Sequence, residues 1–229
     1  MSLIEQFQFN FLDDSRWQFI VSGLKNTIII TFFAVLLGIF LGFVIAIVRS
    51  THDKTGKLKI LNVICRVYLT VIRGTPTMVQ LLIVYYVIFA TVDPGKIVVA
   101  IIAFGMNSAA YVAEIVRSGI MSIDQGQFEA GRSLGLNYTQ TMTKIILPQA
   151  VKNILPALGN ELIVLLKETS ISGYIGLMDL TRGGDIIRSQ TYSALFPLLA
   201  VAAIYLITIN EQIQNIAQKK DTLCRRMYN

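Results

Sequence analysis

Charged residues are scarce in this chain: 15% of its 229 residues are Asp, Glu, Lys or Arg, whereas 54% are hydrophobic. A soluble domain of this length needs less apolar surface, while helices that face lipid require it. The sequence therefore predicts a membrane protein. The net charge of +6 fits membrane topology better than nucleic-acid binding, because no basic patch interleaved with aromatic residues accompanies it.

Histidine and cysteine are nearly absent, which excludes several kinds of site. His52 is the single histidine, and Cys65 and Cys224 lie far apart without metal-ligand spacing. We therefore expect no metal site and two reduced thiols without a chemical role. The sequence also lacks a G-x-S-x-G elbow and a G-x-x-x-x-G-K-[ST] phosphate loop. We expect a chain that is not an enzyme and binds no cofactor of its own.

Five hydrophobic segments predict an all-α, polytopic membrane protein with about five transmembrane helices. They run from about 25 to 48, 58 to 90, 96 to 120, 145 to 166 and 192 to 216. The second is too long for one simple span and is interrupted by the sequence RGTP at 73–76. No repeat or linker divides the chain, so residues 1–229 are expected to form one membrane domain.

The basic residues predict an orientation with the N-terminus outside and the C-terminus in the cytoplasm. In that orientation most Lys and Arg residues fall on the cytoplasmic side, as the positive-inside rule requires. They are Arg49, Lys54, Lys57, Lys59, Arg117, Arg132, Lys144, Lys152, Lys219, Lys220, Arg225 and Arg226. Fewer fall outside: Arg16, Lys25, Lys96, Arg182 and Arg188.

Small residues recur along the first span at helical spacing. Gly38 and Gly42 form a G-x-x-x-G pair between Thr31 and Ala46. Small side chains let helix backbones approach closely in lipid. We expect packing within the molecule rather than a dimer seam.

A polar segment, residues 122–147, separates two apolar stretches and predicts two short helices at the membrane surface. Glu129 is expected near a helix start, where it suits the helix dipole. Gly135 is expected to supply a left-handed turn, after which Asn137 or Thr139 caps the next helix. Pro148 then fits the first turn of the fourth span. An ordinary amphipathic surface loop is the alternative.

The residues of this segment resemble the EAA signature of ABC importer permeases, the loop that docks onto the ATPase subunit. Glu129-Ala130-Gly131 is followed after three residues by Gly135, and after nine more by IILP at 145–148. Gly131 stands where the signature usually has a second Ala. The resemblance implies ATPase coupling for Glu129, Ala130, Gly131, Gly135, Leu136, Leu147 and Pro148.

Further motifs resemble the permeases of polar amino acid importers. RGTPTMVQ at 73–80 is similar to their RGTP-x3-Q stretch, and AYVAEIVR at 110–117 to their AYxAExxR run. The GNE and KETS sequences within 159–170 also match. Asp124-Gln125 replaces the usual Pro-Lys, a departure that we expect to loosen the loop. The chain is identified as a member of the type I ABC importer permeases.

This resemblance implies several partners. They are a second permease, identical or paralogous, two separate ATPase subunits and an extracytoplasmic binding protein that delivers a polar amino acid. ATP would be bound by the partner subunit. The alternative function is an ion-gradient-driven secondary amino acid carrier, but five spans without an internal inverted repeat are fewer than such folds use.

Charges inside the fourth span should face protein or water because lipid burial is costly. Glu161 lies about 20 Å along this helix at 1.5 Å per residue, in its outward half, and shares a face with Glu168. We expect Glu161 to meet a cationic group of the substrate, with Asn160 as a neutral hydrogen-bonding partner. A structural ion pair with Arg73 or Lys167 remains the alternative.

The break in the second segment supplies two further candidates for substrate binding, Arg73 and Thr75. Gly74 and Pro76 interrupt the helix there, and the exposed backbone groups of a broken helix must line protein or a cavity. We expect the break to shape the substrate pathway or its outer gate.

The third span carries a polar stripe of Asn107, Tyr111 and Glu114. We expect hydrogen bonds between helices from the first two, and an ion pair between Glu114 and Arg117, three residues apart.

The glycine-rich segment 169–191 is expected outside. Gly173, Gly176, Gly183 and Gly184 would give re-entrant turns that form a platform for the binding protein, or else a plain connecting loop. Pro197 is expected to kink the fifth span.

Overall fold

The computed structural model describes residues 2–228, and their side chains except those of 3, 54, 55 and 215–228. All regular structure within this part of the chain is helical, which confirms the predicted all-α class. The helices are α1 (Leu3–Phe7), α2 (Trp17–Thr55), α3 (Lys59–Gly74), α4 (Thr77–Ile83), α5 (Lys96–Met121), α6 (Gln125–Ser133), α7 (Tyr138–Thr141), α8 (Leu147–Glu168), α9 (Leu180–Thr191) and α10 (Leu195–Tyr228). Shorter turns lie at η1 (Gln8–Leu12), η2 (Asp13–Ser15), η3 (Val84–Ile88), η4 (Met142–Ile146) and η5 (Thr169–Ile175).

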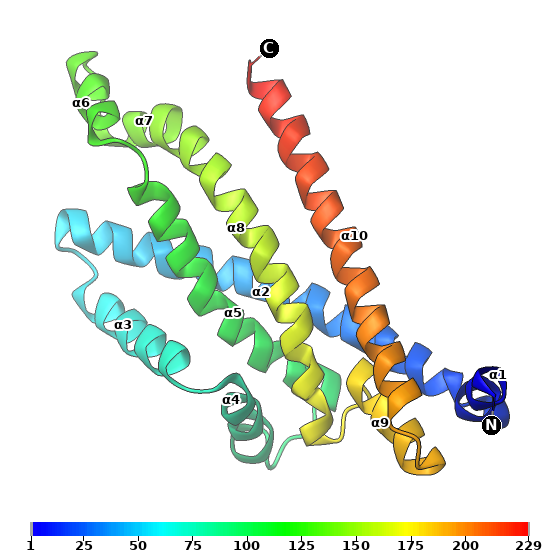
Figure 1. Ribbon diagram of the computed structural model, residues 1–229. Helices are drawn as coiled ribbons and strands as arrows, with labels where there is room; N and C mark the ends of the chain where they lie inside the picture. Colours follow the sequence, from blue (N-terminus) through cyan, green and yellow to red (C-terminus); the bar gives the residue numbers. More distant parts are fainter. Residues whose placement is uncertain (1, 229) are drawn as a thin grey trace.

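Among the described residues, three helices are long and apolar enough to cross a membrane: α2, α5 and α10. The pair formed by α3 and α4–η3 passes the same test together but is bent by 114°, at the predicted interruption. Helix α8 runs beside α5 and α10 and carries more polar residues, among them Asn160 and Glu161 (Figure 1). The candidate membrane spans are therefore long single helices and one broken pair of helices.

Two of the long helices differ from the sequence-based expectation, one in its ends and one in an expected kink. Helix α2 extends well beyond 25–48 at both ends and stops at Gly56, whose φ of 64° is left-handed. Pro197 lies in the first turn of α10, where a missing N–H leaves no hydrogen bond unmade, so the predicted kink in the fifth span is wrong.

Cys65 is a free, half-buried thiol. The side chains of several residues named above lie outside the described residues: Lys54, Lys219, Lys220, Cys224, Arg225 and Arg226.

Helix α2 packs closely along α5, and the two glycines of the first span make this possible. A Cβ added to Gly38 would lie 2.7 Å from Ser108 Oγ, and one added to Gly42 would lie 2.6 Å from Val112 Cγ1. Both distances are shorter than van der Waals contact. The prediction that the G-x-x-x-G pair serves intramolecular packing is confirmed.

The segment 169–191 is a packed helical cap and not a set of re-entrant turns. Gly176 does end η5 with a left-handed φ of 69°. Gly183 and Gly184 instead lie inside α9, where a Cβ would meet the Phe19 carbonyl oxygen at 2.6 Å and Val201 Cγ2 at 2.5 Å. The expectation of turns at these two glycines is wrong, because close helix packing is what requires them.

A buried carboxylate organises this cap. Asp179 accepts hydrogen bonds from the backbone N–H of Arg182 at 2.6 Å and of Gly173 at 3.2 Å, so it caps α9 and joins it to η5. Thr27 of α2 accepts a hydrogen bond from the Leu180 N–H at 3.1 Å. Burial raises the pKa of Asp179 to about 6, although its hydrogen bonds oppose that shift.

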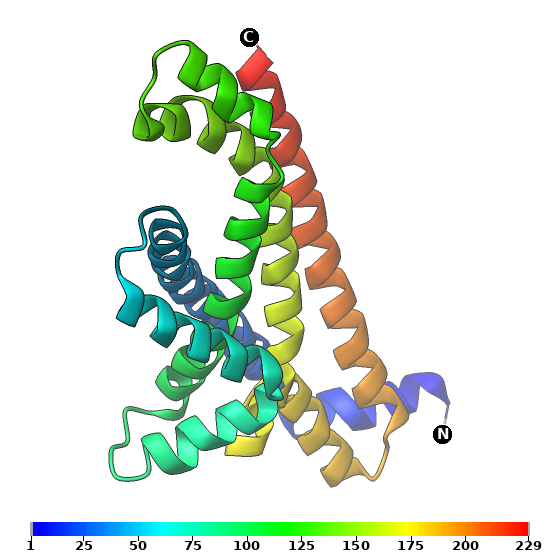
Figure 2. The same ribbon diagram turned by 90° about the vertical axis from the view of Figure 1, so that its left-hand side faces the viewer.

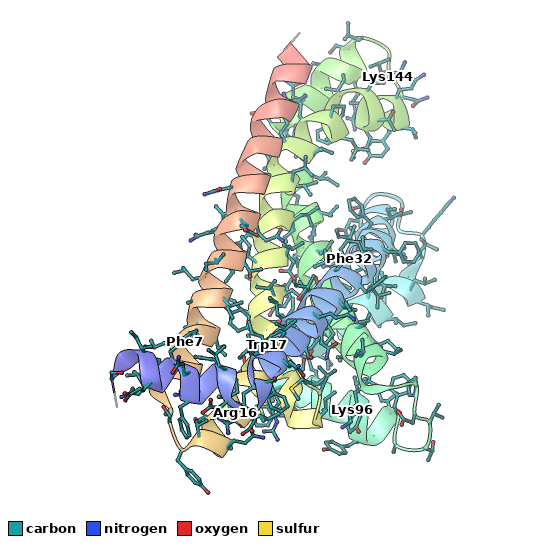
Figure 3. The ribbon with its side chains drawn as sticks, turned by 90° about the vertical axis from the view of Figure 1, so that its right-hand side faces the viewer. Phe7, Arg16, Trp17, Phe32, Lys96 and Lys144 are labelled. Carbon is teal, nitrogen blue, oxygen red and sulfur yellow. The ribbon has the colours of Figure 1, made fainter. Side chains whose placement is uncertain are left out.

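The two ends of the molecule carry different elements. Helices α6 and α7 lie at the end where the chain terminates, whereas the N-terminus, α4 and α9 lie at the opposite end (Figures 1 and 2). In Figure 3, Lys144 lies at one end, and Arg16 and Lys96 lie toward the other. The long axis therefore separates the polar 122–147 segment from the helical cap.

Candidate functional site

The segment 122–147 forms a helical elbow made of α6 and α7. Helix α6 begins at Gln125, and Asp124 Oδ1 accepts a hydrogen bond from the Gly126 N–H at 2.6 Å. Asp124 therefore acts as the helix cap, and the expectation that the Asp124-Gln125 pair loosens the loop stays a prediction. Glu129 lies in the second turn of α6 and not at its start, so the expected stabilisation of Glu129 by the helix dipole is wrong.

The bend of the elbow has the predicted chemistry. Gly135 has a φ of 76°, and its N–H donates to the Arg132 carbonyl at 2.9 Å. The Leu136 N–H donates to the Gly131 carbonyl at 3.0 Å, which completes a Schellman motif. Asn137 then starts α7 with a reciprocal capping box, in which its side chain and that of Gln140 each accept the other's backbone N–H at 2.9 Å. The helix stop and restart are confirmed.

Gly131 is the contact point between the two arms of the elbow. It is buried, and a Cβ there would lie 2.6 Å from Thr141 Cγ2 and 2.7 Å from Thr141 Oγ1. Thr141 is itself buried and β-branched, so it has little rotamer freedom with which to yield. Glycine at this position is therefore more than a small-for-small replacement of alanine.

The elbow is fastened to the ends of α5 and α8. Ile123 and Phe128 pack against a cluster that includes Ile146, Ala150 and Ile154. Asn153 of α8 donates to Ser122 Oγ at 2.7 Å, and Gln149 to Gln127 Oε1 at 3.2 Å. A displacement of the elbow would therefore be transmitted directly to α8.

The predicted coupling residues divide into two groups. Glu129, Ala130, Gly135 and Pro148 are exposed, whereas Gly131 is buried and Leu136 and Leu147 are half-buried. Two exposed side chains of the elbow, Leu134 at 75% and Tyr138 at 45% exposure, escaped the prediction. An apolar side chain flanking the turn glycine was the available sequence signal.

Pro148 lies in the first turn of α8, as predicted, but α8 continues directly from the preceding helical turn. The π turn η4 leads into it without a break from α7. A wider turn before a proline relieves the clash of its ring with the preceding backbone.

The carboxylates of α8 lie on one face and interact electrostatically, as their spacing predicts. Glu161 is buried, and Ser108 of α5 donates to its Oε1 at 2.8 Å. This partner replaces the alternative of an ion pair with Arg73 or Lys167. Glu168 is half-buried, and the Thr77 hydroxyl interacts with it. Asn160 is exposed, so it is not on the buried face with Glu161.

The side chain of Gln80 forms hydrogen bonds across the break between α3 and α4. Gln80 Nε2 lies 2.7 Å from the Ile72 carbonyl, 3.0 Å from the Thr75 carbonyl and 2.9 Å from Thr75 Oγ1. These carbonyls are the acceptors that a helix end leaves without partners. Thr75 is exposed, and its hydroxyl also donates to the Val71 carbonyl at 2.8 Å. Its contacts therefore stabilise the break.

Arg73 belongs to an ion-pair network and does not meet the α8 carboxylates. It lies 3.6 Å from Glu114, which also pairs with Arg49 at 2.8 Å. The predicted pair of Glu114 with Arg117 is wrong, since Arg117 lies 3.9 Å from Asp53 of α2 instead. A basic residue on a neighbouring helix competes with one on the same helix, and sequence spacing alone does not reveal it.

Asn107 and Tyr111 have different environments although both lie on α5. Asn107 is 1% exposed and donates to Gln80 Oε1 at 2.9 Å, which confirms the expected bond between helices. Tyr111 is 38% exposed, so the polar stripe is not uniformly buried.

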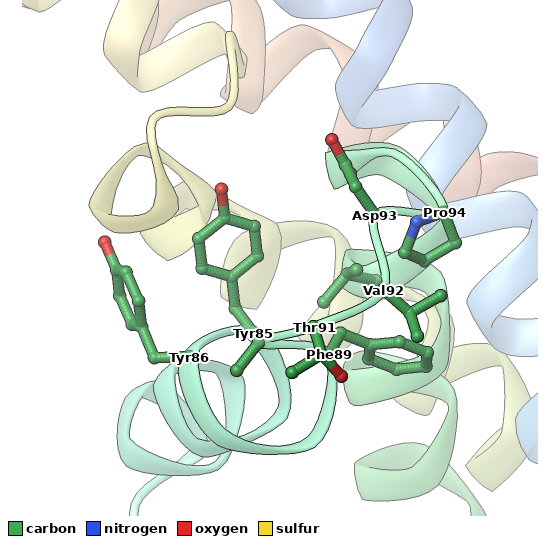
Figure 4. Close-up of a pocket in the computed structure, with 9 residues that line it drawn as sticks. Tyr85, Tyr86, Phe89, Thr91, Val92, Asp93 and Pro94 are labelled. Atoms are coloured by element: carbon green, nitrogen blue, oxygen red, sulfur yellow. The ribbon is translucent and has the colours of Figure 1, made fainter.

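A cavity of about 420 Å³ lies where η3 turns into α5, at the end of the molecule opposite to the elbow. Tyr85, Tyr86, Phe89 and Asp93 are among the residues that line it (Figure 4). The predicted site residues are not part of its lining.

Comparison with known proteins places these features in context. The model of a family described as "Binding-protein-dependent transport system inner membrane component" matches residues 34–211. The chain is 39% identical over 206 residues to "Putative glutamine transport system permease protein GlnP" of Rickettsia typhi, covering 88% of this chain and 92% of the relative. It is also 39% identical over 193 residues to "Arginine transport system permease protein ArtQ" of Bacillus subtilis, covering 83% and 86%.

Solved structures agree with these relatives. A chain from "Crystal structure of an amino acid ABC transporter with histidines" superimposes with a TM-score of 0.83 at 40% identity, over 93% of this chain and 98% of that one. A chain of the inward-facing MetNI methionine ABC transporter gives a TM-score of 0.75 at 20% identity, over 90% and 97%. The second likeness concerns the fold alone.

Proposed function

The chain belongs to the family of binding-protein-dependent transport system inner membrane components, and on that premise we propose that it moves a polar amino acid through a path lined by Glu161 and Glu168. It is the membrane-spanning subunit of an ABC importer and not a secondary carrier. ATP is hydrolysed by a separate subunit, so this chain is not an enzyme.

The cargo is proposed from the relatives and from the charge of the path. The names of two relatives refer to glutamine and arginine, and that of a solved relative to an amino acid transporter with histidines. All three amino acids carry an α-ammonium group. Carboxylates are the side chains that would meet such a group in a membrane interior.

One observation carries this proposal: the two α8 carboxylates interact electrostatically and have no basic partner. Within the described residues, no Lys or Arg nitrogen forms an ion pair within 4.0 Å with Glu161 or Glu168. A pair of partly buried acidic groups is costly unless a cation joins them. A substrate ammonium group would supply that cation during transport.

The elbow is proposed as the docking element for the ATPase, with Glu129, Ala130, Leu134 and Tyr138 on its exposed face. The family implies ATPase and binding-protein partners. We propose two ATPase subunits, a second permease copy or paralogue, and an orientation with the N-terminus outside. The position of the elbow at the same end as the C-terminus supports a shared cytoplasmic side (Figure 1).

The test is uptake by proteoliposomes that contain the complete transporter, with ATP and without any ion gradient. Glu161→Gln and Glu168→Gln are expected to reduce uptake about tenfold or more, because each removes one charge that would pair with the ammonium group. Lys167→Gln, an exposed charge change on the same helix, is the control and should leave uptake unchanged. Wild-type uptake by both carboxylate variants would rule out the proposed path.

A further inference from the structure

A chain of polar contacts with a fixed direction connects α8 to the break between α3 and α4. Asn107 lies at its centre, buried between α4 and α5. Its Nδ2 donates to Gln80 Oε1 at 2.9 Å and lies 3.4 Å from Thr77 Oγ1. Thr77 and Gln80 are three residues apart on α4 and therefore share a face. Asn107 thus contacts both.

The direction of the first half follows from the backbone. The Ile72 and Thr75 carbonyls can only accept hydrogen bonds, so Gln80 must turn its nitrogen toward them. Its oxygen then points to α5 and needs a donor. Asn107 supplies that donor with its amide nitrogen, and its own orientation is fixed in consequence.

The second half follows in the same way. Asn107 has a second N–H, and Thr77 Oγ1 is the acceptor within reach. The hydroxyl proton of Thr77 is then free to point to the Glu168 carboxylate, with which Thr77 interacts. Asn107 therefore donates one N–H toward Thr77 and the carboxylate, and the other toward Gln80 and the helix break.

From this arrangement we infer that Thr77, Asn107 and Gln80 are positioning residues that report occupancy of Glu168 to the α3–α4 break. The inference rests on the proposed function, in which Glu168 meets the substrate ammonium group. Ser108, the next residue on α5, donates to Glu161, so two adjacent residues of one helix contact Glu161 directly and Glu168 through Thr77.

The mechanism is a competition for the carboxylate. A substrate ammonium group at Glu168 offers stronger, charge-assisted hydrogen bonds than a neutral hydroxyl. The Thr77 hydroxyl then turns away, and Asn107 loses its contact with Thr77 Oγ1. Asn107 then shifts relative to Gln80, and the hydrogen bonds of Gln80 to the Ile72 and Thr75 carbonyls weaken. Substrate thereby loosens the 114° bend, and the movement reaches the membrane-spanning helices as a shift of population.

Thr77→Val and Thr77→Ser provide the matched test in the complete transporter with its ATPase and binding protein. Valine keeps the shape and removes the hydroxyl, whereas serine keeps the hydroxyl. The measurement is the ratio of amino-acid-stimulated to basal ATPase activity, together with KM for uptake of arginine and glutamine. We expect Thr77→Val to lower the ratio about fivefold, the size of one net hydrogen bond, with KM changed less than about twofold. Thr77→Ser should restore the ratio.

A wild-type ratio in Thr77→Val, or an equal loss in Thr77→Ser, would overturn the relay. Gln80→Glu gives an independent test, because it keeps an oxygen for Asn107 and removes the donor to α3. It should lower the ratio in the same way, and a wild-type ratio would overturn the relay even if Thr77→Val did not assemble.

Glu168→Gln in the same assay separates the two proposals. A raised KM in Glu168→Gln beside wild-type ratios in the Thr77 and Gln80 variants would refute the relay alone. An unchanged KM in Glu168→Gln would refute the substrate role of Glu168 and, with it, the relay.

Discussion

At the scale of single residues, Asp179 is the clearest example of a side chain that serves local structure at an electrostatic cost. It caps α9 and binds the Gly173 N–H, yet it is fully buried. Burial raises its pKa to about 6. Since the pKa is raised on folding, the stability linked to this proton is present below the unfolded value of about 3.9 and is lost as pH rises through about 6.

Replacing Asp179 with Asn should remove this pH dependence. An Asn oxygen still caps α9 through the Arg182 N–H, so the fold is retained. We expect the Tm of the wild-type protein in detergent to fall between about pH 4 and pH 6, and that of Asp179→Asn to fall less. Groups facing this region, Arg182, Lys96 and Tyr205, are unchanged in the variant. Equal slopes for both proteins would contradict the account.

Gly131 offers a second prediction at this scale, because a Cβ there would meet the stiff side chain of Thr141. Gly131→Ala should destabilise the elbow by about 1–3 kcal/mol, the usual cost of overpacking. The double variant with Thr141→Ala removes both opposing atoms and should recover most of that loss. Thermal unfolding and the amount of ATPase subunit that co-purifies are the measurements, and a double variant no better than the single one would refute the contact.

Single-residue roles were predictable where the cause is local and unpredictable where a partner comes from far along the chain. Gly135 and Asn137 act within their own turns; Gly135 was predicted correctly, and Asn137 was one of the two caps expected. Glu114 pairs with Arg49, 65 residues away, and Asp179 is buried by helices that the sequence does not place beside it. The exposed position of Asn160 next to the buried Glu161 likewise depends on which face of α8 meets α5.

At the scale of elements, the packing of α2 on α5 sets how closely the membrane helices approach. Gly42→Ala would place a Cβ 2.6 Å from Val112 Cγ1 and 3.0 Å from the Ala109 carbonyl oxygen, and the backbone atom cannot rotate away. We expect a loss of about 1–3 kcal/mol, seen as a lower Tm of the purified protein. Gly74→Ala, where a Cβ meets nothing within 4 Å, is the control. Equal Tm values for the two variants would argue against close packing.

Element positions followed from hydropathy and proline, whereas their ends and their packing did not. The interruption at Pro76 was predicted because proline cannot continue the backbone ladder. The bend of 114° was not predicted, because the hydrogen bonds of Gln80 at the break involve Asn107 of another helix. Gly183 and Gly184 looked like turn residues, since a sequence does not distinguish glycines that turn a chain from glycines that admit a neighbour.

At the scale of the whole molecule, the elbow and the helical cap occupy opposite ends of a helical bundle (Figure 2). Helix α8 carries Glu161 and, next to the cap, Glu168. The family and the type of transport were predicted correctly because the motifs are specific in combination. The path and the docking face stay predictions. The two are linked through one helix, because the elbow packs against α8 and α8 carries Glu161 and Glu168.

The most direct test is cross-linking of the complete transporter from single cysteines, after Cys65 and Cys224 have been replaced by Ser. Glu129→Cys is on the exposed face of the elbow, and Asp93→Cys is on the exposed loop at the opposite end. The account predicts that a short bifunctional reagent joins the ATPase subunit to the chain at Glu129→Cys and not at Asp93→Cys. Cross-linking to the ATPase at Asp93→Cys, with none at Glu129→Cys, would contradict it.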